Sequence, residues 1–201
     1  VGEHLDEPSE LLREPWFVDN VLLHPTVAGA LRALLGDGFG LPIIVSNHRV
    51  TTPAPAQQWH HVSHQPLRCP SRVPPQLLPC VASRGAAPLR ATGVATQDGG
   101  SRFDPSTHYL QVFYLPQDTE EELGPLEILP GSHLRHAEVD RETREGDGTF
   151  HTGPLPGGKL LTGRAGTICI TDYPLLHRRT ASSAQGRVRN LIKYNYFRVS
   201  P

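Results

Sequence analysis

A histidine and an arginine stand about twelve residues apart near the carboxyl end of the sequence, at His177 and Arg189. Polar and apolar residues alternate over residues 167–171 and again over 188–199, which predicts two half-buried strands. A hairpin of these strands would bring the two side chains together on one side of a sheet. An imidazole can ligate Fe(II), and a guanidinium can hold a carboxylate through two parallel hydrogen bonds. The pair therefore indicates a metal with an anionic co-substrate beside it.

Three segments together resemble the phytanoyl-CoA dioxygenase family of Fe(II)- and 2-oxoglutarate-dependent oxygenases. They are GPLEILPGSH at residues 124–133, the turn at His177, and GRVRNLIKYNYFR at residues 186–198. The resemblance extends over roughly residues 11–198. It implies a mainly β fold, a double-stranded β-helix (a cupin-like jelly-roll) with flanking α-helices. It also implies an iron site made of a His-x-Asp pair and a distant second histidine, with an arginine downstream for 2-oxoglutarate.

The first half of that metal motif is interrupted. QQWHH at residues 57–61 places His60 at the first ligand position, but the residue two positions later is Val62, which cannot ligate a metal. Residues 62–97 contain six prolines, no Asp or Glu and no sustained periodicity, so they resemble a linker more than part of a core. Removal of these 36 residues joins His60-His61 to Asp98 and restores His-x-Asp. We therefore interpret residues 62–97 as an insert within a single domain spanning residues 1–201.

Two origins for the insert stay open. One is a retained intron. The Val-Ser at the start of the insert can be encoded by a splice-donor sequence, and the Gln at its end can be encoded by CAG, the usual end of an intron. An insert of 36 codons would also keep the reading frame. A genuine lineage-specific loop would need no such coincidence. The entropy of closing a long loop grows slowly, by roughly 0.6 kcal/mol per doubling of length. The insert therefore threatens the geometry between His60 and Asp98 more than the stability of the fold.

The resemblance implies that His60, Asp98 and His177 bind Fe(II) and that Arg189 binds 2-oxoglutarate. The implied reaction consumes O2, with ascorbate as a reductant, hydroxylates a small organic or lipid-like substrate, and releases succinate and CO2. Arg187 competes with Arg189 for the co-substrate, because alternation along a strand would put both on one side.

Other residues offer weaker alternatives for the metal site. His61 and His64 could supply nitrogen ligands but do not match the motif. Relatives that lack the carboxylate can bind halide there, but they carry Gly or Ala where this chain has the bulkier Val62. His133 is assigned to a structural turn and Asp172 to turn capping. Two functional alternatives remain: a non-catalytic family member with a disrupted metal site, acting as a binding module or a mis-spliced product, and a cupin-like protein that holds zinc.

Composition limits the class of protein. A net charge of −1 gives no reason to expect a nucleic-acid partner, and no stretch approaches the roughly 18 apolar residues of a membrane span. Cys69, Cys80 and Cys169 form neither an even set nor a CxxC pair, which favours a reducing compartment. We expect a cytoplasmic protein with a small-molecule substrate. Because the chain begins at Val1, a peroxisomal signal before it stays open.

The remaining elements follow from periodicity and from glycine and proline. Residues 8–36 are predicted to be helical, with Pro25 in a first turn and Gly36 as the stop. Strands are predicted over residues 41–50, 109–115 and 126–129, and a solvated loop over 137–159.

Overall fold

The computed structural model describes residues 3–6, 9–42, 45–61, 109–135 and 151–198, and the strands within them form two antiparallel sheets. The larger sheet consists of β1 (Glu3–Asp6), β2 (Phe39–Gly40), β3 (Val45–Thr51), β4 (Tyr109–Tyr114), β7 (Ile168–Asp172), β9 (Val188–Arg189) and β10 (Ile192–Arg198). The smaller sheet consists of β5 (Leu126–Ile128), β6 (Lys159–Leu161) and β8 (His177–Arg179).

Strands that are distant in sequence meet in the larger sheet. Its main path runs β1-β3-β10-β4-β7, while β2 pairs with β10 and β9 pairs with β3. β10 is central, because it pairs along β4 from Ile192↔Tyr114 to Phe197↔Tyr109 and also pairs with β3. Curled antiparallel sheets with few helices make this fold a jelly-roll, which confirms the double-stranded β-helix predicted from the sequence.

Four helical segments come from the first part of the chain: η1 (Ser9–Arg13), α1 (Pro15–Phe17), the π-helical turn η2 (Val18–Leu22) and α2 (Pro25–Leu35). Two short 3₁₀ turns occur later, η3 (Glu121–Leu123) and η4 (Ser132–Leu134). Glu14 and His24 each precede a proline and have ψ angles of 113° and 134°. A proline ring clashes with a helical residue before it, so each proline starts a new helix. The single helical stretch expected over residues 8–36 is therefore divided.

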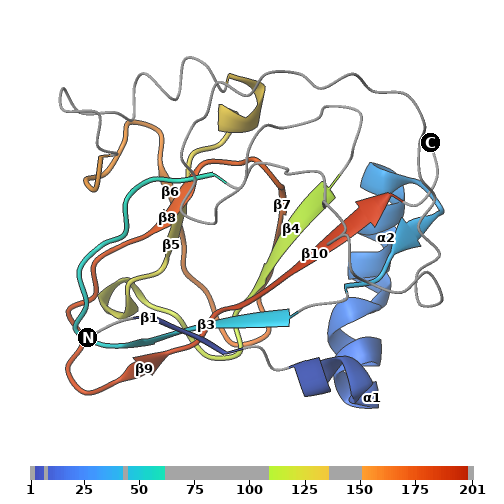
Figure 1. Ribbon diagram of the computed structural model, residues 1–201, viewed down its shortest axis with the longest axis horizontal. Helices are drawn as coiled ribbons and strands as arrows, with labels where there is room; N and C mark the ends of the chain where they lie inside the picture. The colour runs from blue at the N-terminus through green and yellow to red at the C-terminus, as the bar shows by residue number, and fades with distance from the viewer. Residues whose placement is uncertain (1–2, 7–8, 43–44, 62–108, 136–150, 199–201) are drawn as a thin grey trace, which may run out of the picture.

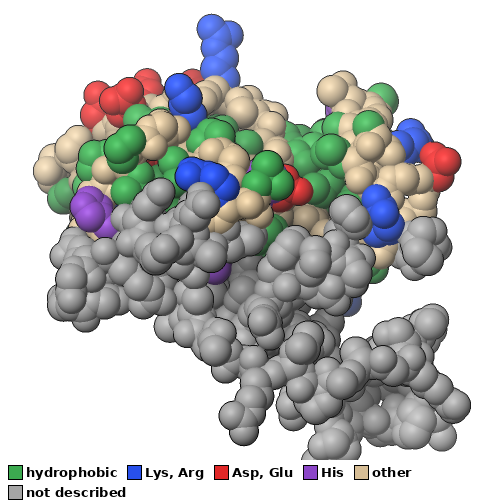
Figure 2. All heavy atoms as spheres, turned by 90° about the horizontal axis from the view of Figure 1, so that it is seen from above, with side chains coloured by type: hydrophobic (Ala, Val, Ile, Leu, Met, Phe, Trp, Pro, Cys, Tyr) green, Lys and Arg blue, Asp and Glu red, His purple; other side chains and the backbone are tan. Residues whose placement is uncertain are grey.

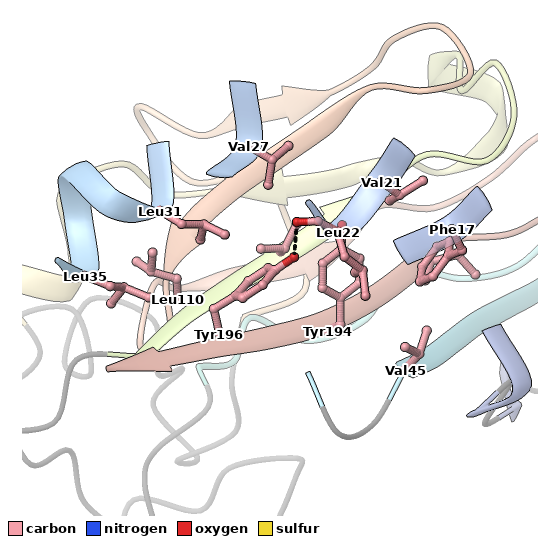
Figure 3. Close-up of a cluster of buried hydrophobic side chains, with 12 residues drawn as sticks. Phe17, Val21, Leu22, Val27, Leu31, Leu35, Val45, Leu110, Tyr194 and Tyr196 are labelled. Atoms are coloured by element: carbon pink, nitrogen blue, oxygen red, sulfur yellow. Dashed lines mark hydrogen bonds between the residues drawn. The ribbon is translucent and has the colours of Figure 1, made fainter. Parts of the chain in front are cut away.

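The helices α1, η2 and α2 cover the outer face of the larger sheet. Figure 3 shows side chains from α1, η2 and α2 packed against alternate residues of β3, β4 and β10. The buried members are Phe17, Val21, Leu22, Val27, Leu31, Leu35, Val45, Leu110, Val112, Ile192, Tyr194 and Tyr196. The Tyr196 hydroxyl donates a hydrogen bond to the Leu22 carbonyl oxygen at 2.7 Å, which links β10 to the end of η2. Each fully buried apolar side chain contributes about 1.5–3 kcal/mol.

A second apolar cluster joins the two sheets. Phe113 and Leu115 contribute from β4 and the residue after it, and Leu126 contributes from β5, together with Leu191. In Figure 1, α2 lies on the opposite side of β4 and β10 from β5, β6 and β8. The larger sheet therefore has an outer face toward the helices and an inner face toward the smaller sheet.

The predicted hairpin between His177 and Arg189 is wrong. The segment after Gly166 forms two strands, β7 in the larger sheet and β8 in the smaller one, separated by a turn in which the Leu175 amide donates to the Asp172 carbonyl. His177 begins β8 instead of ending the preceding strand. Arg189 ends β9, which pairs with β3 in the other sheet. The two residues thus come from different sheets.

No helix among the described residues is long and apolar enough to cross a membrane. On the face shown in Figure 2, Lys and Arg side chains are scattered among acidic and apolar ones, with no extended basic patch among the described atoms.

Candidate metal centre

His60 and His177 lie side by side, although 117 positions separate them in the sequence. The His60 amide donates to the His177 carbonyl oxygen at 3.0 Å, and the His177 amide donates to the His60 carbonyl oxygen at 2.9 Å. Their ring centroids are 4.5 Å apart. This isolated β-bridge brings together the two histidines that the sequence resemblance implicates as metal ligands.

Both rings use the same nitrogen to contact the backbone. His60 Nδ1 lies 2.9 Å from the Gln58 carbonyl oxygen, and His177 Nδ1 lies 2.8 Å from the Leu175 carbonyl oxygen. A carbonyl oxygen only accepts, so each Nδ1 carries the proton and each Nε2 carries the lone pair. A metal-ligating histidine commonly donates its other ring N–H to a carbonyl oxygen in this way. In this tautomer Nε2 is the nitrogen through which each imidazole could bind a metal.

His177 is also held in the neutral form. Its side chain is buried, and this burial is the largest cause of a pKa well below the ordinary value for histidine. The neighbouring His60 lowers the pKa further, and Lys193 and His48 add smaller effects in the same direction. The contact with the Leu175 carbonyl oxygen opposes them. A neutral imidazole is the form that binds a metal ion.

The position of His177 depends on segments that precede it in sequence. In the smaller sheet it pairs with Ile128 of β5. The hydroxyl of Ser132, which follows the Pro130-Gly131 turn, accepts a hydrogen bond of 2.9 Å from the Leu176 amide. The Phe113 ring from the larger sheet approaches the His177 ring edge-on, with centroids 5.5 Å apart. Part of the 124–133 motif thus fixes the strand that begins with His177.

His60 is positioned through Trp59, whose side chain is fully buried. The indole N–H donates to the Gly153 carbonyl oxygen at 2.8 Å, and the Trp59 amide donates to the His151 carbonyl oxygen at 3.0 Å. The Arg178 guanidinium lies over the indole, 5.1 Å from the ring centroid. Trp59 therefore anchors the segment that carries His60 against β8.

Arg178 belongs to a buried ion pair that sequence reasoning missed. Its Nε donates to Glu127 Oε2 at 2.7 Å, its Nη2 lies 2.6 Å from the same oxygen, and its Nη1 donates to the Thr152 carbonyl oxygen. The two side chains are 5% and 6% exposed and face each other across β5 and β8. A lone acidic residue inside the apolar stretch PLEILP was a signal that a buried cation had to face it.

The two arginines proposed for the co-substrate lie in different environments. Arg189 is 1% exposed, in β9. Arg187 precedes that strand, has a side chain that is 49% exposed, and forms an ion pair of 3.6 Å with Glu120. Since Arg187 is outside the strand, the alternation that would have put both on one side does not apply. Burial distinguishes the two residues that sequence spacing did not.

The remaining candidates for the metal site fall into two groups, those outside the described residues and those within them. Asp98, Val62 and His64 lie within residues 62–108, outside the described residues, as does the whole predicted insert. Within the described ranges, no group of three or more His, Cys, Asp or Glu side chains is arranged so that it could hold a metal ion. His61 is buried beside His60 in the chain. His133 lies in η4, where its Nε2 is 3.3 Å from an Asp172 carboxylate oxygen.

The two histidine rings fit part of an iron site. A facial set of two imidazoles and one carboxylate leaves open positions on Fe(II). The described residues supply the two imidazoles with their Nε2 lone pairs, and the carboxylate assigned from the sequence lies outside them. The donor set is thus compatible with the metal that the sequence resemblance implies.

No protein-family model and no curated protein matches the sequence, but solved structures share its fold. HygX from Streptomyces hygroscopicus with iron bound has a TM-score of 0.58 at 16% identity, covering 98% of this chain and 72% of HygX. HygX with nickel and 2-oxoglutarate bound has a TM-score of 0.54 at 17% identity, covering 96% and 71%. EctD from S. alaskensis with bound Fe has a TM-score of 0.54 at 16% identity, covering 98% of this chain and 57% of EctD. At these identities the similarity shows the jelly-roll fold.

Proposed function

We propose that this protein is an Fe(II)- and 2-oxoglutarate-dependent oxygenase of the type that the phytanoyl-CoA dioxygenase resemblance implies. His60, Asp98 and His177 bind the iron, and Arg189 binds the far carboxylate of 2-oxoglutarate. The reaction uses O2, hydroxylates a small organic or lipid-like substrate, and releases succinate and CO2, with ascorbate as a reductant. The observation that carries the proposal is the bridged pair of histidines, whose Nδ1 atoms both contact backbone carbonyl oxygens.

The chain's own residues supply binding and orientation. His60 and His177, through Nε2, and the Asp98 carboxylate would hold the iron, which would supply the oxygen chemistry when bound. The Phe113 ring beside His177 and the burial of His177 keep water away from that ligand. Crystal structures of HygX with nickel and 2-oxoglutarate and of EctD with Fe support this choice of metal and co-substrate through the shared fold.

Arg189 is favoured over Arg187 because it is buried. A guanidinium holds a carboxylate through two parallel hydrogen bonds, and such a pair is strongest away from water. Arg187 is half exposed and already lies near Glu120. We expect Arg189→Leu to raise the KM for 2-oxoglutarate at least tenfold, whereas Arg187→Leu leaves it within about twofold. Equal effects of both substitutions would refute the assignment.

We further infer that residues 1–201 form one domain interrupted by an insert at residues 62–97. The protein would act in the cytoplasm on a small molecule, without nucleic acid. The free thiol of Cys169 is in keeping with a reducing compartment.

The decisive experiment compares Fe(II)-dependent succinate formation by the full chain with that of a variant lacking residues 62–97. Asp98→Ala in the shortened background is the control. If only the shortened protein turns over and Asp98→Ala abolishes turnover, the insert disrupts a site built from His60, Asp98 and His177. If both forms turn over, the long insert is tolerated. If neither binds Fe(II) or forms succinate, the proposed function is wrong.

A further inference from the structure

Gln111 is a buried amide without a hydrogen-bond partner among the described residues. Its side chain is 0% exposed, and neither Oε1 nor Nε2 has a partner there. Most buried polar groups in folded proteins are hydrogen-bonded, because an unsatisfied one loses its interaction with water and gains nothing. An amide with both polar atoms unsatisfied is therefore a candidate for binding a group that the chain itself does not provide.

The alternation of β4 places Gln111 on the inner face of the larger sheet. Leu110 and Val112 pack against the helices on the outer face. Phe113 belongs instead to the cluster between the sheets, and its ring lies against His177. Because side chains two residues apart on a strand share a face, Gln111 points to the same side as Phe113. The unpartnered amide thus shares its face with a residue that contacts the candidate metal centre.

Asn195 extends this polar region onto the next strand. It pairs with Gln111 in the register of β10 and β4, and its neighbours Tyr194 and Tyr196 pack on the outer face, so Asn195 points inward. Its Oδ1 is also buried without a hydrogen-bond partner among the described residues. Directly opposed residues have Cβ atoms about 4.5–5.5 Å apart, close enough to bind one ligand group together.

The strand on the other side of Gln111 does not satisfy its amide. Thr171 of β7 is the register partner of Gln111, but its hydroxyl donates to the Gln111 backbone carbonyl oxygen at 3.2 Å. The side-chain amide of Gln111 thus gains no hydrogen bond from either neighbouring strand.

We propose that Gln111 and Asn195 bind the substrate of the oxygenase site through a neutral group that both donates and accepts hydrogen bonds, namely a hydroxyl or an amide. This inference rests on the proposed function for the site and adds the substrate class to it. The two side chains present two acceptor oxygens and one donor NH₂ that have no partner in the described part of the chain. A carboxylate offers no donor and a hydrocarbon offers neither, so 2-oxoglutarate and a purely aliphatic chain both fit poorly here.

Tyr194 provides a matched control on the same sheet. Its hydroxyl is buried and also has no hydrogen-bond partner among the described residues, but it lies in the cluster under the helices, on the opposite face from Gln111. Tyr194→Phe and Gln111→Met each remove an unsatisfied buried polar group and keep the shape. Both should raise Tm, by about 2–12 °C. Only the Gln111 substitution should alter ligand binding.

The test measures dissociation constants of two probes, hexanamide and hexanoate, for the full chain by calorimetry, with and without 2-oxoglutarate. Hexanamide carries a donor and an acceptor, and hexanoate carries acceptors only. We expect the unsubstituted protein to bind hexanamide about tenfold more tightly than hexanoate. Gln111→Met should remove that preference and Tyr194→Phe should retain it. Asn195→Leu, as a second inward variant, should reduce the preference as well.

Two results would overturn the proposal. In the first, Gln111→Met raises Tm but leaves the preference for hexanamide intact, so that Gln111 is only an unsatisfied core amide. In the second, the unsubstituted protein binds hexanoate as tightly as hexanamide, or binds neither. Since binding is measured without turnover, failure of the oxygenase assignment would appear separately, as absence of succinate formation with the amide preference unchanged.

Discussion

Replacing Glu127 by leucine should destabilise the protein strongly, because it leaves the buried guanidinium of Arg178 without its counter-ion. The two side chains are almost fully buried, and Glu127 Oε2 receives the Nε hydrogen bond of Arg178 and lies 2.6 Å from Nη2. Leucine fills a similar volume but accepts no hydrogen bond. Removing one partner of a buried pair typically costs about 3–5 kcal/mol, a large part of the roughly 5–15 kcal/mol by which a protein is stable.

An exposed pair in the same chain provides the control. Arg187 and Glu120 are 3.6 Å apart, with side chains 49% and 66% exposed, so Glu120→Leu should cost no more than about 1 kcal/mol. Urea unfolding would measure both changes in free energy, and thermal unfolding followed by circular dichroism would measure the matching changes in Tm. For a chain of this size we expect Tm to fall by about 6–20 °C in Glu127→Leu, and by less than about 4 °C in Glu120→Leu.

The double variant Glu127→Leu/Arg178→Met tests the cause. Because it removes both charges, it should be more stable than Glu127→Leu alone, although the Thr152 carbonyl loses the hydrogen bond from Arg178. The reasoning would be refuted if Glu127→Leu lowered the free energy of unfolding by no more than Glu120→Leu does. It would also be refuted if the double variant were less stable than Glu127→Leu alone.

Two further predictions concern the backbone and the core. Gly124 has a φ of +69°, and a Cβ there would lie 2.8 Å from a backbone oxygen. Gly124→Ala should therefore destabilise the protein by about 1–3 kcal/mol in urea unfolding. As a control, Gly29→Ala, in the open face of α2, should stabilise it by about 0.5–1 kcal/mol. Burial raises the pKa of Tyr194 and Tyr196 above the ordinary value near 10. Because the pKa of each tyrosine is higher in the folded state than in the unfolded state, it contributes stability that is present below pH 10. This contribution is lost as the pH rises above 10, by up to about 1.4 kcal/mol per pH unit for each tyrosine. The Tyr194→Phe/Tyr196→Phe variant should show a much flatter profile between pH 10 and 12, and an unchanged profile would contradict the argument.

Local signals in the sequence predicted several elements well. Pro25 and Gly36 bound α2 as expected, and the apolar, aromatic stretch after His108 is the buried strand β4. β5 covers three of the four residues predicted, because it ends before the Pro130-Gly131 turn. Pro15 was a signal that the first helical stretch would be broken. The strand expected over residues 41–50 is observed as β3, Val45–Thr51, with residues 43–44 outside the described part.

Pairing between strands was harder to predict, since period-two alternation says which residues share a face but not which sheet they join. The strand predicted over residues 167–171 was therefore expected to form a hairpin with residues 188–199, although β8 lies between them in the chain and belongs to a different sheet from β7. The contact between His60 and His177 depends on pairing across the fold, and only the family resemblance pointed to it. The ion pair of Glu127 and Arg178 likewise joins residues 51 positions apart. The insert and Asp98 stay predictions.

The bridge between His60 and His177 is made of main-chain atoms alone. Any amino acid other than proline offers the same N–H and C=O groups, so the two positions can keep their spacing while their side chains change. The side-chain atoms at these two positions are thus separable from the main-chain hydrogen bonds that hold the positions together. If His60 and His177 are the metal ligands, aspartate or cysteine at either position would change the donor atoms while the main-chain bridge still sets the spacing of the two backbones, which makes this bridge a starting point for changing metal preference by design and in evolution.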